Sequence, residues 1–381
     1  MARLGDICVK ITDGSHNPPQ GIENSEFLML SSKNVYDDKI TFDEPRYLSE
    51  PDFAVEDKRT AINAGDVLLT IVGTVGRTAV VPEINIHLCL QRSVAVIKPK
   101  RDIISPRFLM YQLQSMRPYL EGEARGVAQK GIYLKQVENL QIKVFEPAKQ
   151  QQIVSTLDKI TDLISLRKQQ LAKLDELVKA RFVELFGATS ADKCSKQIKD
   201  YAEVLGGYAF KSDMFCTNAV PVIRISNINN GCVDPDYDVC YDELFWEQNK
   251  RFRAEQNDIL MAMSGATTGK AGLYKEDMPA LINQRVACIR AKDGIACPMF
   301  LFVATQLEWM YDLIQETSAG CAQPNISGKQ IENMPVPDAT YEQQQQFAAF
   351  VEQTDKSKLA IQQSLDKLET LKRSLMQKYF G

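Results

Sequence analysis

Two long stretches of the chain repeat apolar residues at alternating steps of four and three positions. In residues 153–185, eight of ten repeat positions are apolar. In residues 347–379, seven of ten are apolar, with Thr354, Lys358 and Lys372 as the polar exceptions. Such a repeat forms the seam of a coiled coil, so we expect two long helices that pack against each other. A face for docking another protein is the alternative.

The residues before each long stretch follow a different pattern. Short runs rich in β-branched residues alternate with Gly, Pro and Asn, which is typical of strands separated by turns. A helical patch, Pro106–Glu121, interrupts them in the first half. The pattern predicts a strand-rich α/β (α+β) domain before each helix. The clearest strand candidates are Asp66–Val72, Val94–Ile97, Asp258–Met263 and Ala287–Ile289.

The two halves of the chain repeat each other. Residues 126–140 read GVAQKGIYLKQVENL, and residues 320–334 read GCAQPNISGKQIENM. The run GDVLLTIVGTVGRTAVV likewise matches NDILMAMSGATTGKAGL. We pair Gln91-Arg92 with Gln284-Arg285 and Asn34 with Asn227. So many matches at a nearly fixed offset indicate an internal duplication.

These patterns divide the chain into four parts. We expect strand-rich domains at residues 1–147 and 188–340, and long helices at 148–187 and 341–381. At a rise of 1.5 Å per residue, each helix is about 55 Å long. A pseudo-twofold relation of the halves would make the helices antiparallel and hold the domains apart by about one to two turns of B-DNA. Dimeric DNA-binding proteins measure half-sites in this way.

Composition narrows the class of protein. The chain is 44% hydrophobic and 25% charged, with a formal net charge of −4, which argues against binding along DNA by bulk charge but allows a local basic cleft. Nine cysteines without a C-x-x-C pair are typical of reduced thiols rather than disulfides or a zinc site. With no long apolar run and no secretory signal, we expect a cytoplasmic protein.

The candidate catalytic motifs are incomplete. Asn17-Pro18-Pro19 resembles the motif with which amino-methylating DNA methyltransferases hold a base, but Gln20 stands where an aromatic ring would stack. No two glycines are separated by a single residue, so the Gly-x-Gly turn of a usual S-adenosylmethionine pocket is missing. SGATTGKA is one residue short of a phosphate-binding loop. The carboxylates of residues 51–58 are expected in a solvated loop rather than at a nuclease metal. We therefore expect no catalytic residue, metal site or cofactor in this chain.

Several stretches, in this order and in duplicate, resemble the specificity subunit of type I restriction–modification systems. The resemblance covers essentially the whole chain, and polar residues in the second helical repeat are its one departure. The stretches that carry it are DGSHNPP, GGYAFKSDMF, VPVIRISNI, SGATTGKAGLY, INQRVACIR, EPAKQQQIVSTLDKITDLI and DATYEQQQQFAAFVEQTDK.

The resemblance implies two target-recognition domains that read a split DNA sequence, with the long helices as spacers. It implies partners as well: two copies of an adenine-N6 methyltransferase subunit and two restriction translocase subunits. S-adenosylmethionine, ATP and Mg²⁺ would then belong to the partners, and this chain would be non-catalytic.

Candidate DNA contacts fall into two groups. Arg77 and Lys270 each follow a glycine in a turn that suits a phosphate, and Arg92 and Arg285 each precede a buried strand. For these recurring residues a structural role is the alternative. The second group differs between the halves and therefore suits sequence reading. It comprises Ser15, His16 and Asn17 against Tyr208, Phe210 and Lys211, then Lys33 against Arg224, and Lys130.

Three alternatives remain open at this point. The chain could serve a related phage-defence methyltransferase system that lacks the restriction subunit. It could be a self-contained DNA adenine methyltransferase or nuclease, or a coiled-coil scaffold whose end domains bind proteins.

Overall fold

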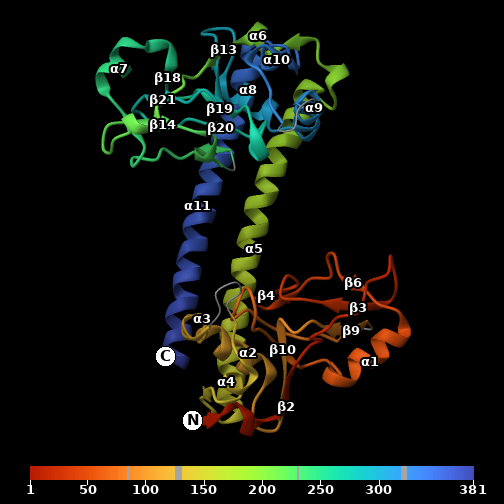
Figure 1. The fold of residues 1–381 in the computed structure, drawn as a ribbon. Coiled ribbons are helices and arrows are strands. Elements are labelled where there is room, and N and C mark those ends of the chain that lie inside the picture. The colour runs from red at the N-terminus through yellow and green to blue at the C-terminus, as the bar shows by residue number, and fades with distance from the viewer. Residues whose placement is uncertain (84–85, 125–130, 230, 319–323) are drawn as a thin grey trace. The chain divides into compact units, whose positions relative to one another are not determined.

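The computed structural model describes nearly the whole chain. The residues left out are 84–85, 125–130, 230 and 319–323. The chain forms two compact units, Met1–Arg167 with Ser364–Gly381 and Lys168–Gln363. Each unit contains one strand-rich domain and segments of both long helices, α5 (Pro147–Phe186) and α11 (Tyr341–Phe380). Figure 1 shows the elements along the chain.

The first domain contains two main sheets. An antiparallel sheet has the order β2-β10-β7-β8, and a mixed sheet has the order β6-β3-β9. Their strands are β2 Cys8–Asp13, β3 Phe27–Leu30, β6 Arg46–Tyr47, β7 Val67–Thr70, β8 Thr78–Val80, β9 His87–Leu90 and β10 Val94–Pro99. Two short pairs are β1 Ala2–Arg3 with β11 Gln141–Ile142, and β4 Val35–Tyr36 with β5 Lys39–Ile40. The helices are α1 Glu50–Thr60, α2 Pro106–Ser115, α3 Arg117–Glu123 and α4 Leu134–Glu138.

The second domain repeats this arrangement. Its larger sheet, β13-β22-β19-β20-β16-β15, begins with the four strands that match β2-β10-β7-β8, and its smaller sheet has the order β17-β14-β21-β18. The larger sheet contains β13 Ala202–Gly206, β15 Ile228–Asn229, β16 Cys232–Val233, β19 Ile259–Ala262, β20 Ala271–Leu273 and β22 Val286–Ala291. The smaller contains β14 Val220–Ile223, β17 Cys240–Tyr241, β18 Arg253–Ala254 and β21 Ala280–Ile282, and β12 Lys196–Gln197 pairs with β23 Pro335–Val336. The helices are α6 Ile198–Tyr201, α7 Glu243–Gln248, α8 Pro298–Thr305, α9 Glu308–Ser318 and α10 Gly328–Glu332. The duplication is confirmed.

The central strands are apolar on both faces because each face meets a different core. Val67 and Leu69 of β7 belong to the core that contains Phe108 of α2. Leu68, between them, belongs to the core that contains Leu28 of β3. Successive side chains of a strand point to opposite faces, so an unbroken apolar run marks a strand covered on both sides. The predicted strand-rich domains are therefore present with the expected central strands.

The helical patch predicted at residues 106–121 is divided in the structure. Helix α2 ends at Ser115, and α3 begins at Arg117 after Met116, whose φ of −86° and ψ of 0° close the first helix. Pro118 lies in the first turn of α3, where its missing N–H costs nothing.

In the second unit, segments of α5 and α11 pack in antiparallel fashion. Phe182 contacts Phe347 with ring centroids 5.3 Å apart, and earlier in α5 Asp175 meets Lys358, later in α11, at 2.6 Å. Thr354, a polar exception in the repeat, is buried and donates to the Phe350 carbonyl at 2.9 Å. Lys358 thus pairs with a residue of the other helix, and Thr354 bonds a carbonyl of its own helix.

The aromatic ends of the two helices occupy matching places. Phe186, at the end of α5, packs on Phe300 of α8, and Phe380, at the end of α11, packs on Phe108 of α2. The predicted seam position Leu185 is instead 40% exposed, because the buried Phe182 and the partly buried Phe186 make the contact with the second domain.

A buried glutamine fastens α5 to the first domain. Gln150 is 2% exposed, and its Oε1 accepts from the Ser105 backbone N–H at 2.8 Å. Its Nε2 donates to the carbonyls of Ile103 at 2.9 Å and Phe145 at 2.7 Å. One side chain therefore joins the start of α5 to the segment that leads into α2.

The second domain contains the same device. Gln344 of α11 is fully buried and accepts from the Cys297 N–H at 2.8 Å. Its Nε2 donates to the carbonyls of Ile295 at 3.3 Å and Ala339 at 3.0 Å. The Gln-rich start of each long helix therefore supplies one buried anchor per unit.

Only the first unit adds a charged cluster to this anchor among the residues described. Arg107 of α2 binds Asp158 of α5, with Nη2 2.6 Å from Oδ1, and its Nη1 lies 3.0 Å from Asp38. The Tyr111 hydroxyl donates to Asp158 at 2.6 Å. Burial raises the pKa of the Asp38 carboxyl, and the Arg107 guanidinium offsets part of the rise. In α8 of the second domain, Met299 stands at the position of Arg107 and is apolar.

We predict that Gln344→Ala destabilises the second unit by about 2–3 kcal/mol, because it leaves a buried N–H and two carbonyls without this partner. Both tryptophans of the chain, Trp246 and Trp309, lie in the second unit, so their fluorescence during urea unfolding reports on it. Gln345→Ala, at an exposed neighbouring position, is the control and should change stability little. Equal curves for the two variants would contradict the anchoring role.

Candidate nucleic-acid interface

In the first domain, the two main sheets meet at Ser15. The Ser15 N–H donates to the Leu90 carbonyl at 2.7 Å, and the Arg92 N–H donates to the Ser15 carbonyl at 2.9 Å. The backbone after β2 thereby joins the end of β9 in a parallel bridge. The Ser15 side chain is buried, whereas Asn17 and Arg92 are exposed. Of these predicted contacts, Asn17 and Arg92 are therefore accessible to a ligand.

In the second domain, Tyr208 makes the same junction. Its N–H donates to the Ile282 carbonyl at 2.8 Å, and the Gln284 N–H donates to its carbonyl at 2.8 Å. Tyr208 thus occupies the place of Ser15, as predicted from the aligned stretches, but its side chain is 38% exposed. The backbone hydrogen bonds that join the sheets, here called the frame, are the same in both domains, whereas the side chain at this position differs.

These hydrogen bonds correct one predicted pairing. Gln284 takes the place of Arg92, because each donates its N–H to the carbonyl of the junction residue. Arg285 takes the place of Ser93, because its carbonyl accepts from the Met263 N–H as the Ser93 carbonyl accepts from the Ile71 N–H. The pairing of Gln91-Arg92 with Gln284-Arg285 is therefore wrong by one position. The backbone bridge, not the repeated dipeptide, sets the register. Arg92 and Arg285 are both exposed, but they do not share one place in the fold.

A second pairing is confirmed at an asparagine turn. Asn34 accepts from the Ser31 N–H at 3.1 Å and donates to the Asp43 carbonyl at 2.8 Å. Asn227 accepts from the Arg224 N–H at 2.9 Å and donates to the Asp234 carbonyl at 2.9 Å. Each asparagine thus closes the same loop.

The same turn shows that Lys33 and Arg224 are not equivalent. Arg224 stands where the first domain has Ser31, whereas Lys33 lies two residues further along the turn. The side chain of Lys33 is exposed, while Arg224 forms an ion pair with Asp236 at 3.2 Å. Their comparison across the repeat was wrong by two positions, because only the asparagine fixes the alignment.

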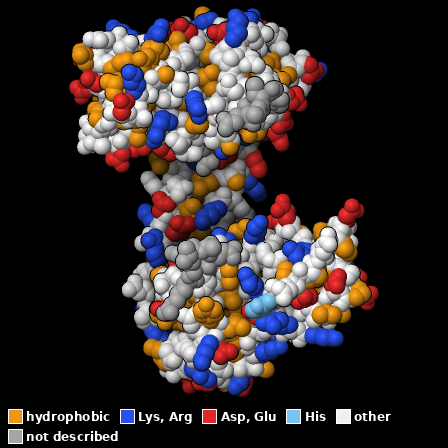
Figure 2. All heavy atoms as spheres, in the orientation of Figure 1, with side chains coloured by type: hydrophobic (Ala, Val, Ile, Leu, Met, Phe, Trp, Pro, Cys, Tyr) orange, Lys and Arg blue, Asp and Glu red, His pale blue; other side chains and the backbone are white. Residues whose placement is uncertain are grey.

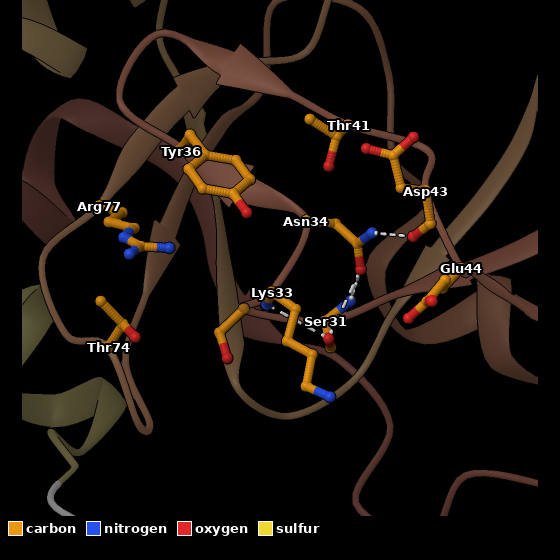
Figure 3. A pocket seen from close by; sticks show the side chains of 10 residues that line it. Ser31, Lys33, Asn34, Tyr36, Thr41, Asp43, Glu44, Thr74 and Arg77 are labelled. Carbon is orange, nitrogen blue, oxygen red and sulfur yellow. Dashed lines mark hydrogen bonds between the residues drawn. The ribbon is translucent and has the colours of Figure 1, made fainter. Parts of the chain in front are cut away.

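The asparagine turn borders a polar pocket of about 410 Å³ in the first domain. Figure 3 shows Lys33 and Arg77, predicted separately, on the lining of this one pocket. The Arg77 guanidinium lies over the Tyr36 ring, 4.9 Å from its centroid, and Asp43 and Glu44 add acidic groups. The lining therefore offers donors, acceptors and a ring, the groups that contact phosphates and base edges.

The glycine turns before Arg77 and Lys270 are equivalent, as predicted. Gly76 and Gly269 have φ of 89° and 84°, and their N–H groups donate to the carbonyls of Thr70 and Ala262, both at 2.9 Å. The turn itself therefore occupies the N–H groups of these two glycines. The cationic side chains remain: Arg77 is half-buried and Lys270 is exposed.

His16 belongs to a charged cluster that sequence reasoning missed. Its Nε2 lies 2.8 Å from a carboxylate oxygen of the buried Asp13, and Arg59 pairs with the other oxygen. Arg59 comes from α1, whose residues were predicted to form a solvated loop. That prediction was wrong: Ser49 caps α1 by accepting from the Asp52 N–H at 3.3 Å. The Ser-x-x-Asp spacing was the available signal.

The loop around Asn17-Pro18-Pro19 is held from the neighbouring strand β6. The Arg46 guanidinium donates to the Pro19 carbonyl at 2.8 Å. This bond and the His16 cluster fix both sides of the exposed Asn17.

The corresponding front of the second domain is aromatic. Tyr208 lies 4.9 Å from Phe245 and 5.2 Å from Phe252, measured between ring centroids. Phe210 packs on Tyr241 at 4.8 Å. Lys211, the next residue, is exposed.

The remaining predicted residue, Lys130, lies outside the described residues. On the face seen in Figure 2, basic side chains are interspersed with acidic and apolar ones. In the described ranges, no three His, Cys, Asp or Glu residues are grouped as metal ligands. Among the helices described there, none is long and apolar enough to cross a membrane.

The two halves are thus a duplicated domain with the same backbone hydrogen bonds where the sheets meet and with different exposed side chains there. The family model described as the type I restriction modification DNA specificity domain matches residues 3–176 and again residues 192–373. The chain therefore belongs to this family, and the predicted resemblance is confirmed.

Similar proteins agree with this assignment. The MjaVIII specificity subunit of a type I restriction enzyme from Methanocaldococcus jannaschii is 22% identical over 341 residues, covering 84% of this chain and 80% of that protein. The EcoBI specificity subunit from Escherichia coli is 22% identical over 324 residues, covering 76% and 68%.

Two solved structures share the fold. The type I restriction–modification S subunit from M. genitalium has a TM-score of 0.56 at 13% identity, covering 100% of this chain and 95% of that one. A chain from a structural study of complex assembly in a type I restriction–modification system has a TM-score of 0.57 at 16% identity, covering 100% and 96%.

We predict that Gly269→Ala destabilises the second unit by roughly 2 kcal/mol, because φ is positive and the new Cβ would lie 2.7 Å from Ile314 Cγ2. Gly206→Ala is the control, since nothing lies within 4 Å of its added Cβ and φ is not positive there. Tryptophan-monitored urea unfolding measures both. A cost for Gly269→Ala no larger than that of the control would show that the turn tolerates a side chain.

Proposed function

We propose that this chain reads a split DNA target, one part with each domain, and brings a methyltransferase to it. The relatives are named as specificity subunits of type I restriction enzymes, which supports a DNA-reading role. The observation that carries the proposal is the common backbone frame at Ser15 and Tyr208, with chemically different surroundings. Two readers built alike but presenting different side chains suit two different half-sites.

The two readers use different chemistry in this proposal. The first presents Asn17 beside a charged cluster, together with Lys33 at the polar pocket. The second presents Tyr208 and Lys211 beside packed aromatic rings. Arg77 and Lys270, at equivalent turns, bind phosphates and set the position of each domain, because phosphate contacts carry no sequence information.

The chemistry of the complex belongs to its partners. We propose that the chain is a non-catalytic component, joined by two adenine-N6 methyltransferase subunits and two restriction translocase subunits. S-adenosylmethionine, ATP and Mg²⁺ bind to those subunits. The methyltransferase flips the adenine that it modifies, while this chain selects the site.

The long helices set the spacing between the half-sites. Forty residues of helix span about 60 Å at 1.5 Å per residue, so each added heptad would lengthen a helix by about 10 Å. Three base steps of B-DNA span about the same distance at 3.4 Å per step.

We predict a split methylation motif with a constant spacer. N6-methyladenine is mapped across the genome of cells that carry this chain and its methyltransferase partner. One heptad inserted into both α5 and α11 should lengthen the spacer while leaving both half-sites unchanged. Deletion of the chain should abolish methylation at the motif.

Other outcomes identify the alternatives. A continuous motif, or methylation that persists without this chain, would overturn the proposal. Methylation by the purified chain with S-adenosylmethionine alone would make it an enzyme. A motif that is methylated without any restriction of unmodified DNA, with no restriction gene nearby, would indicate the related phage-defence system. Absence of salt-sensitive DNA affinity in the methyltransferase complex would favour a protein-binding scaffold.

We predict that Arg77→Gln and Lys270→Gln weaken DNA binding of the methyltransferase complex without altering the motif. Each variant should flatten the slope of log affinity against log salt by about 0.9, which corresponds to one lost phosphate contact. Binding is measured by fluorescence anisotropy at several salt concentrations. Lys149→Gln, which removes an exposed cation on α5, is the control. An unchanged slope for both turn variants would remove them from the interface.

A further inference from the structure

Two cysteines of the second domain lie directly opposite each other on neighbouring segments. The Cys216 N–H donates to the Cys240 carbonyl at 3.0 Å, and the Cys240 N–H donates to the Cys216 carbonyl at 2.9 Å. Such a reciprocal antiparallel pair has Cα atoms about 5.5 Å apart and side chains on one face. This separation lies inside the range of roughly 4.4–6.8 Å that a disulfide spans.

The two thiols differ in access. Cys216 is exposed, whereas Cys240 is fully buried and its Sγ donates to the Tyr237 carbonyl at 3.2 Å. We propose that Cys216 and Cys240 form a reversible disulfide by exchange with a low-molecular-weight disulfide such as oxidised glutathione.

The exchange has two steps. The Cys216 thiolate attacks oxidised glutathione, forms a mixed disulfide and releases one glutathione thiolate. After rotation away from the Tyr237 carbonyl, the Cys240 thiolate attacks the Cys216 sulfur and releases the second glutathione. The two protein thiols lose two electrons to the glutathione disulfide, and their protons pass to the two released thiolates. Reduced glutathione reverses both steps.

The geometry favours a bond that is easily reduced. Cβ atoms of directly opposite residues lie about 4.5–5.5 Å apart, but a disulfide needs about 3.5–4.5 Å. Closing the bond therefore draws the two segments together and strains them. Strained or exposed disulfides are the labile ones.

Burial makes the thiols of several other cysteines harder to ionise. It raises the pKa of the Cys8 and Cys89 thiols to about 12, and raises that of Cys288 as well. Since the thiolate is the nucleophile, these groups react slowly near neutral pH. Cys232 is exposed like Cys216 and serves as a comparison for access alone.

The disulfide would join the edge segment between Lys211 and Asn218 covalently to β17. On its other side β17 pairs with β14, Cys240 facing Pro221, so the Cys216 segment forms the outer row of this sheet. Its further contacts include the Asn218 N–H donating to the Tyr237 carbonyl at 3.2 Å, the Tyr241 hydroxyl donating to Met214 Sδ at 3.2 Å, and the Phe215 ring against Tyr241. A covalent bond here would restrict opening of the segment between Lys211 and Asn218.

The experiment uses the full-length chain under native conditions. Reduced protein is incubated with graded ratios of reduced to oxidised glutathione, alkylated, and mapped by mass spectrometry without reduction. We expect a peptide pair joined through Cys216 and Cys240 that dithiothreitol removes. Amide hydrogen exchange of residues 211–218 should slow by on the order of tenfold in the oxidised protein, because opening is restricted.

Three variants test whether disulfide formation requires the neighbouring pair Cys216 and Cys240 or only an exposed thiol. Cys240→Ser should stop at a mixed disulfide on Cys216, and Cys216→Ser should leave Cys240 unmodified. Cys232→Ser should form the disulfide like the unaltered chain. Tryptophan fluorescence verifies that each variant is folded. A mixed disulfide on Cys216 as the end product in the unaltered chain, pairing with another cysteine, or unchanged hydrogen exchange would each overturn the proposal. None of these results depends on DNA binding, so they are independent of the proposed function.

Discussion

The buried glutamine at the start of each long helix is the contact on which the arrangement of each unit depends. An amide can accept one hydrogen bond and donate two at once, so Gln150 and Gln344 each satisfy three backbone groups that the junction would otherwise bury without partners. Unpaired polar groups at such a junction are costly, which restricts how the helix can leave the domain. The direction of each long helix is thereby set by hydrogen bonds as well as by apolar packing.

The residues beside this buried glutamine are charged in the first unit and apolar in the second. The first adds Arg107, Asp158 and Tyr111, a hydrogen-bonded network between α2 and α5. The second has Met299 and Val303 at the matching positions, beside a pocket of about 430 Å³. Charged networks demand a specific geometry, whereas apolar contacts tolerate small shifts. Helix α5 is therefore held to the first domain partly by a charged network, whereas α11 meets apolar side chains at the matching positions of the second domain.

The sequence predicted the parts of the fold that repeat or alternate. Apolar runs covered on both faces gave the central strands, and the asparagines at 34 and 227 gave a correct equivalence because their side chains close the same turn. The site was harder to predict. The dipeptide at Gln91 suggested a register that the backbone bridge at Ser15 shifts by one residue. Arg59 was missed because its helix was taken for a loop, and its ion pair with Asp13 joins residues far apart in the chain.

The register error arose where the two sheets are joined by backbone hydrogen bonds. The bonds that join the two sheets use only the backbone of Ser15 and Tyr208. A backbone bond imposes almost no demand on the side chain at that position, so the fold persists whichever residue is presented there. The buried strands behind it accept few substitutions, because their packing is dense. Similarity between the two halves therefore lies in the strands and in the glycine and asparagine turns, and not in the side chains exposed where the sheets meet. The same division explains why the family can be assigned from this chain although the exposed side chains at the two junctions differ.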